Sequence, residues 1–193
     1  MNATNSDRLQ ELLDRQDITE CLQRYSRGLD RSDRELAKSA YHPDALDDHQ
    51  AYIGPGHGLV DWGDGFHHEV WASHQHYLCN CTIELDGDTA HTETYFIVAA
   101  RKRDSFETFL CGGRYIDRLE RREGEWKIAA RICTSEWVLE EEVAAKMIPI
   151  SFPISRDRDD VSYQRPLQVE REQRILFGPG AEQAEAAEFA AGE

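Results

Sequence analysis

The chain has 193 residues, the length of one domain with appendages, and this is enough to bury a core around a ligand cavity. It carries 22 Lys and Arg against 37 Asp and Glu, a formal net charge of -15, which repels phosphate backbones and anionic lipids. We therefore expect no nucleic-acid and no membrane partner. The polar first residues, the lack of any run of about 18 apolar residues and an odd number of cysteines predict a cytoplasmic protein with reduced thiols.

The sequence predicts helices in the first part of the chain. From Arg8 to Leu29, apolar residues recur at intervals of three and four, which is typical of an amphipathic helix. Ser32 and Glu35 have the spacing of a capping box, so a second, short helix should follow and end before His42-Pro43. The glycine-rich run at 54–58 predicts a loop, and a third helix is expected from about Leu59 to Trp71.

Beyond these helices the pattern changes to strict alternation. Residues 74–85 predict a long strand, and Asp86-Gly87-Asp88 a hairpin turn into a returning strand over 89–102. Residues 106–121 and 125–137 repeat this arrangement around a second turn at 122–124. The expected fold class is α+β, a cone-shaped α+β barrel in which N-terminal helices pack on a curved, mostly antiparallel sheet that encloses a pocket.

The C-terminal part differs in composition. A short helical run at 140–147 precedes a charged, proline-containing stretch and an Ala- and Glu-rich tail. We divide the chain into a barrel domain, residues 1–140, and a C-terminal extension, residues 141–193. The extension is expected to pack partly on the domain or on a neighbouring subunit, and its last ~15 residues to be mobile.

Three kinds of titratable residue stand out in the predicted core elements. His74 and His76 share one strand face, where they are either functional or ordinary histidines near a sheet end. Asp30 lies at the end of the first helix, where the helix dipole disfavours a carboxylate. Alternation puts Arg131 opposite Trp126, Ile128 and Ile132, and because Lys127 shares its face, an interior or an exposed guanidinium is equally compatible with the pattern.

Several segments follow one another in a fixed order: Ile18 to Asp30 with Tyr25-Ser-Arg-Gly-Leu-Asp30, the strand His76-Tyr-Leu-Cys-Asn80, Asp86-Gly-Asp-Thr-Ala90 with Glu93-Thr-Tyr95, and Gly124-Glu-Trp126-Lys-Ile-Ala-Ala-Arg131. Together they resemble the SnoaL-like family of the nuclear transport factor 2-like superfamily. The resemblance covers about Leu9 to Trp137. The family includes scytalone dehydratase, hexachlorocyclohexane dehydrochlorinase and bile acid 7α-dehydratase, and the chain departs from it in its long extension and its abundant histidines.

The resemblance implies a catalytic site. In the family, an aspartate at the end of the first helix and a strand histidine form a dyad, and these positions correspond to Asp30 and His76. An aspartate that holds one imidazole nitrogen fixes the tautomer and supports the charge of a general base. Tyr25 matches a tyrosine that polarises a carbonyl or assists a leaving group, although it is equally compatible with a core aromatic. Arg131 matches an arginine that binds a leaving group or an oxyanion.

The predicted function is a cofactor-independent lyase acting on a hydrophobic, aromatic or polycyclic substrate by dehydration, dehydrohalogenation or retro-aldol cleavage; isomerisation starts from the same proton transfer. Aromatic residues of the third helix and the strands indicate the pocket. The predicted substrate contacts are Trp62, Trp71, Asn80, Tyr95 and Tyr115, and Asn80 is also explained by a structural role. We expect a homo-oligomer, a trimer or a dimer, because an open sheet face and the extension both need burial.

Two other functions fit parts of the sequence. A metalloenzyme is one, because Asp47, Asp48, His49, His67, His68, His74 and His76 are ligand types that zinc or iron accepts, although their spacing fits no known motif, and no metal or organic cofactor is expected. A non-catalytic binding module, or a structural protein similar to a dioxygenase β-subunit, is the other, because the same fold serves such roles. An acid–base pair argues against that second alternative.

Overall fold

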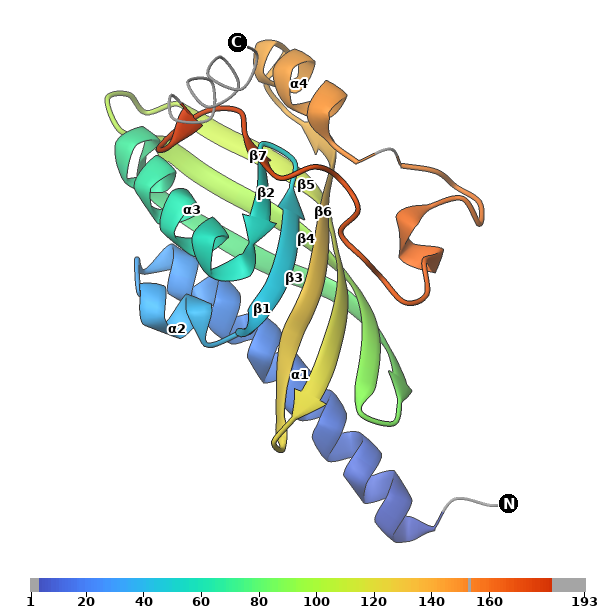
Figure 1. The fold of residues 1–193 in the computed structure, drawn as a ribbon. Helices are drawn as coiled ribbons and strands as arrows, with labels where there is room; N and C mark the ends of the chain where they lie inside the picture. Colours follow the sequence, from blue (N-terminus) through green and yellow to red (C-terminus); the bar gives the residue numbers. More distant parts are fainter. Residues whose placement is uncertain (1–3, 153, 182–193) are drawn as a thin grey trace, which may run out of the picture.

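The computed structural model describes residues 4–152 and 154–181. Helices α1 (Asn5–Asp30), α2 (Arg34–Lys38) and α3 (Gly56–Val70) pack against one curved sheet, and α4 (Glu141–Met147) follows it (Figure 1). The strands are β1 (Tyr41–His49), β2 (Tyr52–Pro55), β3 (Trp71–Asp86), β4 (Thr89–Lys102), β5 (Thr108–Arg122), β6 (Glu125–Val138) and β7 (Arg174–Ile175). Single turns of 3-10 helix lie at Ile148–Ile150 and Val161–Tyr163.

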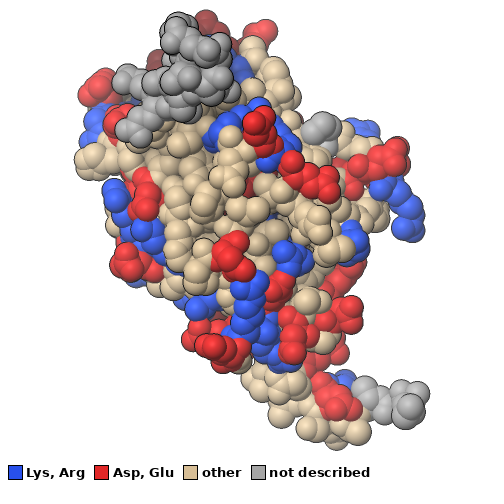
Figure 2. Space-filling model, viewed as in Figure 1, with Lys and Arg blue, Asp and Glu red and all other residues tan. Residues whose placement is uncertain are grey.

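The described strands form a single sheet in the order β3-β4-β5-β6-β1-β2-β7. Only the β1–β6 pair is parallel; the other neighbouring pairs are antiparallel. The α+β class, the N-terminal helices and the mostly antiparallel meander are confirmed. None of the described helices is long and apolar enough to cross a bilayer. Figure 2 shows acidic and basic side chains intermingled over one face of the molecule.

The predicted loop at residues 54–58 was wrong. β2 continues to Pro55, and α3 begins directly at Gly56. A β-carbon at Gly56 would lie 2.5 Å from the ring of Tyr41, so this glycine allows the helix start to pack on that tyrosine and does not break the structure. The polar sequence did not predict β1 and β2 as strands. In the structure β1 pairs in parallel with β6, and β2 pairs antiparallel with β1.

Helix α1 changes its environment along its length. Thr4 and Asp7 form a capping box at its start, and the residues that follow extend beyond the sheet (Figure 1). There Leu9, Leu12 and Leu13 are 58%, 64% and 48% exposed. The C-terminal half lies on the concave face of the sheet and buries Ile18, Cys21, Leu22, Tyr25 and Leu29. The second half of the helix therefore fixes the position of Asp30, its last residue.

Register shifts interrupt the alternation from which side-chain directions were predicted, and two of them change the orientation of predicted site residues. In β6, Leu119 pairs with Ile128 but Arg118 with Ala130, so Ala129 is an extra residue. Arg131 consequently shares the concave face with Trp126 and Ile128. Of the three residues that were predicted to lie opposite it, only Ile132 does so. In β3, a bulge at Cys79 and Asn80 lies between the Leu78–Phe96 and Cys81–Thr94 pairs.

The C-terminal extension packs on the convex face of its own domain. Ile116 and Ile132 of β5 and β6 form a second apolar cluster with Val161 and Leu167. Arg114 of β5 is bound by both carboxylate oxygens of Asp160, at 2.9 and 3.0 Å. The end of the extension then returns to the sheet edge, where β7 pairs with β2. The expectation of mobility for the last ~15 residues concerns positions that lie almost entirely outside the described residues.

Candidate active site

Asp30 occupies the last position of α1, where the carbonyl end of the helix dipole disfavours its charge. The strand that passes this helix end compensates for it. The backbone N–H of His76 lies 3.1 Å from both carboxylate oxygens of Asp30, and the His76 Nδ1 lies 2.7 Å from Oδ1. The carboxylate is thus fixed by β3, and the predicted contact between Asp30 and His76 is present in the structure.

These contacts define the protonation pattern of the His76 ring. A carboxylate can only accept, so Nδ1 carries the proton and donates it to Asp30. The lone pair then lies on Nε2, on the side of the ring turned away from the helix end. The His76 side chain is 6% exposed, and its ring centroid lies 6.1 Å from that of His67 on α3. Nε2 is therefore available as a base in an enclosed space.

The neighbouring histidines have different roles. His74 Nε2 donates to the carbonyl of Leu29 at 3.0 Å, which satisfies one of the free carbonyls at the end of α1. Burial and then the nearby His76 lower the pKa of His74. His67 packs on His74 with ring centroids 4.4 Å apart, and among the described residues its buried Nδ1 has no hydrogen-bond partner. Burial and the other histidines lower the pKa of His67 well below its usual range, so its ring is neutral.

A pocket of about 330 Å³ opens next to this cluster. Asp30, His67 and His74 line it, and so does Trp71, whose ring stacks on Phe109. The rest of the lining comes from the α1–α2 turn, the end of α3, the start of β3 and the β4–β5 connection, namely Arg31, Ser32, His68, Ala72, Ser73 and Arg103. The pocket gives a small molecule a route to the dyad.

Tyr25 and Arg131 lie deeper in the same interior. The Tyr25 ring makes edge contacts with Tyr41 and Tyr115, and its buried hydroxyl has no hydrogen-bond partner in the described part of the chain. The Arg131 guanidinium is fully buried between the rings of Tyr25 and Tyr115, at 4.3 and 4.2 Å from their centroids. Asp117 binds its Nε and Nη2 at 2.6 and 2.8 Å.

This arrangement changes the interpretation of Arg131. Its side chain is interior, as the resemblance implies, but it has no exposed atom and is committed to Asp117 and the two rings. Its contribution to the site is indirect: by cation–π contact the guanidinium holds the rings of Tyr25 and Tyr115 in position. The sequence did not predict its partner Asp117, although both residues are inward-facing and directly paired across β5 and β6.

The predicted substrate contacts are not all brought together. Tyr115 lies in the interior, stacked on Phe96, and Trp71 lines the pocket. Trp62 packs on Phe66 under the C-terminal extension, where its indole N–H donates to the Phe177 carbonyl. Asn80 is exposed at the bulge of β3, and Tyr95 is 47% exposed on the convex face of β4. Neither of the last two residues reaches the interior: the bulge turns Asn80 outward, and Tyr95 lies opposite the inward-facing Phe96 in the regular alternation of β4.

Three side chains at the pocket are of types that bind metal ions. Asp30, His74 and His76 place possible ligand atoms within 4.8 Å of one another. The nitrogens nearest to the carboxylate, however, donate protons, His76 Nδ1 to Asp30 and His74 Nε2 to a carbonyl. A metal ion would have to displace both protons and both hydrogen bonds. The hydrogen bonds favour an acid–base pair.

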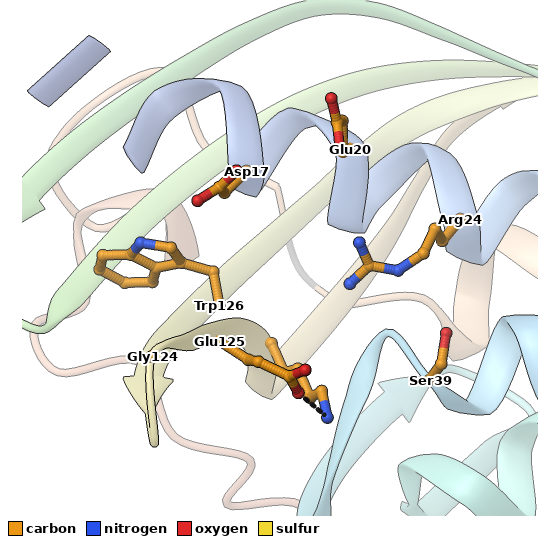
Figure 3. A pocket seen from close by; sticks show the side chains of 8 residues that line it. Asp17, Glu20, Arg24, Ser39, Gly124, Glu125 and Trp126 are labelled. Carbon is orange, nitrogen blue, oxygen red and sulfur yellow. Dashed lines mark ion pairs between the residues drawn. The ribbon is translucent and has the colours of Figure 1, made fainter. Parts of the chain in front are cut away.

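A larger hollow of about 380 Å³ lies elsewhere, between α1 and the β5–β6 turn (Figure 3). Asp17, Glu20 and Arg24 line it from the helix, and Glu125 pairs with Lys127 on the opposite side. Its surface is charged and none of the residues around the dyad contributes to it. We therefore place the candidate site at the histidine cluster.

Comparison with solved structures defines the fold. A candidate scytalone dehydratase from Novosphingobium aromaticivorans aligns with a TM-score of 0.60 at 16% identity, over 66% of this chain and 87% of that one. A type 3 hexachlorocyclohexane dehydrochlorinase from Novosphingobium barchaimii gives 0.61 at 20% identity, over 67% and 91%. A nuclear transport factor 2-like protein from Salmonella enterica gives 0.57 at 19% identity, over 65% and 93%. The chain thus has the nuclear transport factor 2-like fold.

The family follows from the sequence itself. The model of the SnoaL-like domain matches residues 10–132, which include Asp30, His76 and Arg131. The chain therefore belongs to the SnoaL-like family. It has no significant match among curated proteins.

Proposed function

We propose that the chain is a cofactor-independent lyase that uses Asp30 and His76 as an acid–base dyad on a hydrophobic, ring-bearing substrate. The observation that carries this proposal is the 2.7 Å contact between Asp30 Oδ1 and His76 Nδ1 beside an accessible pocket. Two of the structural neighbours, a candidate dehydratase and a dehydrochlorinase, are named for eliminations, which supports the reaction class. Dehydration, dehydrohalogenation and retro-aldol cleavage all begin with one proton transfer of this kind.

The geometry supports a specific division of labour. His76 Nε2 removes a proton from the substrate, and Asp30 stabilises the imidazolium that results. The unpartnered Tyr25 hydroxyl donates to a substrate oxygen that gains negative charge. Arg131, under the Tyr25 ring, holds this tyrosine in place, and burial raises the pKa of Tyr25, so its hydroxyl keeps the proton that it donates. Trp71, which lines the pocket, provides aromatic contact surface for the substrate.

The test is a screen of ring-bearing alcohols and halides with purified protein, no added cofactor and excess chelator. We expect turnover under these conditions. His76→Asn and Asp30→Asn should each lower it by about 100-fold or more, since a general base contributes 10²- to 10⁴-fold, and the double variant should be little worse than either. His42→Asn and Asp14→Asn are matched controls, because they alter a buried histidine and a buried α1 aspartate away from the pocket.

Three results would contradict the proposal. Additive losses in the double variant would mean that Asp30 and His76 do not act as a unit. Equal losses in the control variants would mean that the effect is structural. Activity lost to the chelator and restored by one metal ion would replace the acid–base dyad by a metal centre.

A further inference from the structure

A second aspartate–histidine pair faces the same interior from β1. Asp47 Oδ1 lies 3.1 Å from His49 Nδ1, and its Oδ2 accepts the Tyr41 hydroxyl at 2.6 Å. The Asp47 side chain has no solvent exposure. As in the first pair, the carboxylate can only accept, so His49 Nδ1 donates and Nε2 is directed away from Asp47. The sequence singled out both residues only as possible metal ligands.

The position of the pair in the sheet places it on the concave face. Asp47 is directly paired with Arg131 of β6, which points inward, and His49, two residues on, has the same orientation. The His49 ring lies 5.9 Å from that of Tyr115. Its side chain keeps 23% of its surface exposed, whereas Asp47 and Asp48 before it in β1 are buried. His49 is also close enough to His67, the neighbour of His76, to contribute to the lowered pKa of His67.

The surroundings of His49 favour its protonated form. Burial acts against the charge, but the neighbours Cys133 and Tyr25 and the hydrogen-bonded Asp47 outweigh it and raise the pKa of His49 well above its usual range. From the other packed elements, His67 of α3, Cys111 and Tyr115 of β5, and Arg131 of β6 also face it. This direction favours a protonated His49, and Asp47, hydrogen-bonded to Nδ1, is the carboxylate that stabilises it; the pKa of His67 is shifted the other way.

The polar atoms left over in this interior indicate an oxygen-bearing ligand. The Tyr25 hydroxyl and His67 Nδ1 are buried and have no partner within the described ranges. A buried polar group that has no hydrogen bond destabilises the folded chain, and a ligand that supplies the missing partner binds more tightly for it. A hydrocarbon or a simple halide satisfies neither group, but a substrate that carries a carbonyl and a hydroxyl satisfies both.

We propose that His49, held by Asp47, is the general acid of this site and that the leaving group is a hydroxyl, which makes the reaction a dehydration. This inference rests on the proposed function. His76 Nε2 takes the proton from the carbon next to a carbonyl, and the electrons of that C–H bond form the new double bond. The C–O bond breaks, and the His49 proton passes to the departing oxygen, which leaves as water. Exchange with solvent then deprotonates His76 and reprotonates His49.

The chemistry of leaving groups explains why a second histidine points to an alcohol. Hydroxide is a poor leaving group and needs a proton as the C–O bond breaks, so a general acid accelerates its loss. A halide or a carboxylate leaves as a stable anion and gains little from such an acid. A protonated histidine opposite the base is therefore expected for dehydration and unnecessary for dehydrohalogenation.

The experiment compares two leaving groups on one carbon skeleton. The probes are the aldol of benzaldehyde and acetone, a β-hydroxy ketone, and its acetate ester; elimination from either gives benzylideneacetone, which is followed by its ultraviolet absorbance. The variants are His49→Asn and His76→Asn, in which the asparagine amide can still donate to the paired aspartate. Asp47→Asn tests the positioning residue through the pH profile of kcat for the hydroxy ketone.

His49→Asn should lower turnover of the hydroxy ketone by about 100-fold or more and leave that of the acetate nearly unchanged. Retained acetate turnover also shows that this variant is folded. His76→Asn should lower turnover of both probes. Asp47→Asn should shift the basic limb of the pH profile to lower pH, because it removes the charge that keeps His49 protonated.

The failures of the two proposals differ. Equal effects of His49→Asn on both probes, or no effect on either, would overturn the role of His49 and leave the dyad intact. A wild-type protein that eliminates acetate but not water would do the same. Failure of the wild type with both probes would count against the proposed function itself.

Discussion

The buried ion pair between Arg131 and Asp117 allows a quantitative prediction of stability. Both side chains have no exposure, and their two hydrogen bonds measure 2.6 and 2.8 Å. Asp117→Asn keeps the shape of the side chain but leaves the guanidinium without a counter-ion. Removal of one partner of a buried pair costs about 3–5 kcal/mol, a large part of the ~5–15 kcal/mol that stabilises a typical domain. For a chain of this size, that corresponds to a fall in Tm of about 6–20 °C.

The assay is thermal and urea unfolding followed by circular dichroism, with wild type, Asp117→Asn, Arg131→Met and the double variant Asp117→Leu with Arg131→Met. The double variant should recover most of the loss, because apolar residues of similar volume replace a buried pair at little cost. Asp14→Asn is a control for a buried aspartate whose partner, Arg121, is partly exposed. A loss below about 1 kcal/mol for Asp117→Asn is the range of exposed pairs and would mean that water reaches this interior.

Two further predictions concern the outside of the sheet. Burial and then Arg165 lower the pKa of His91, under the extension, from 6.5 to about 4, so its contribution to folding is complete above pH 6.5 and is lost as the pH falls towards 4. Urea unfolding across this range should show the loss, and His91→Gln should reduce it; an unchanged slope would contradict the burial of His91. The convex face of β3 and β4 exposes Tyr77 and Ile97, and an exposed apolar patch of this kind favours association. Light scattering should therefore give the mass of a dimer or trimer, and Ile97→Glu should weaken the association. A monomeric wild type would refute this prediction.

Sequence reasoning located the elements well because their signals are local. The three- and four-residue spacing of α1, the hairpin glycines Gly87 and Gly124, which have positive φ, and the alternation of β3 to β6 each depend on nearby residues. The contact between Asp30 and His76 is not local, since 46 residues separate them. It was inferred from the family resemblance, because neither periodicity nor composition indicates which helix end meets which strand.

Sequence reasoning did not assign Asp47, His49 and His67 to the site, because the directions of their side chains are set by packing between distant parts of the chain. Asp47 and His49 lie in a polar segment that did not read as a strand, and their common face became visible only when β1 was found beside β6. His67 was one of several histidines in α3, and a pattern does not show which of them turns inward. A useful signal was nevertheless present, because an Asp and a His two residues apart point to one side of any strand.

The bulge at Ala129 shows how one extra residue serves both faces of the sheet. Without it, Arg131 would share the convex face with groups that the extension covers, and a guanidinium would replace Ile132 against Val161 and Leu167. With it, Arg131 reaches Asp117 and the tyrosine rings, and Ile132 anchors the extension. A one-residue change of register exchanges the two faces of a strand. The charge under the candidate site and the attachment of the extension therefore depend on the same feature of β6.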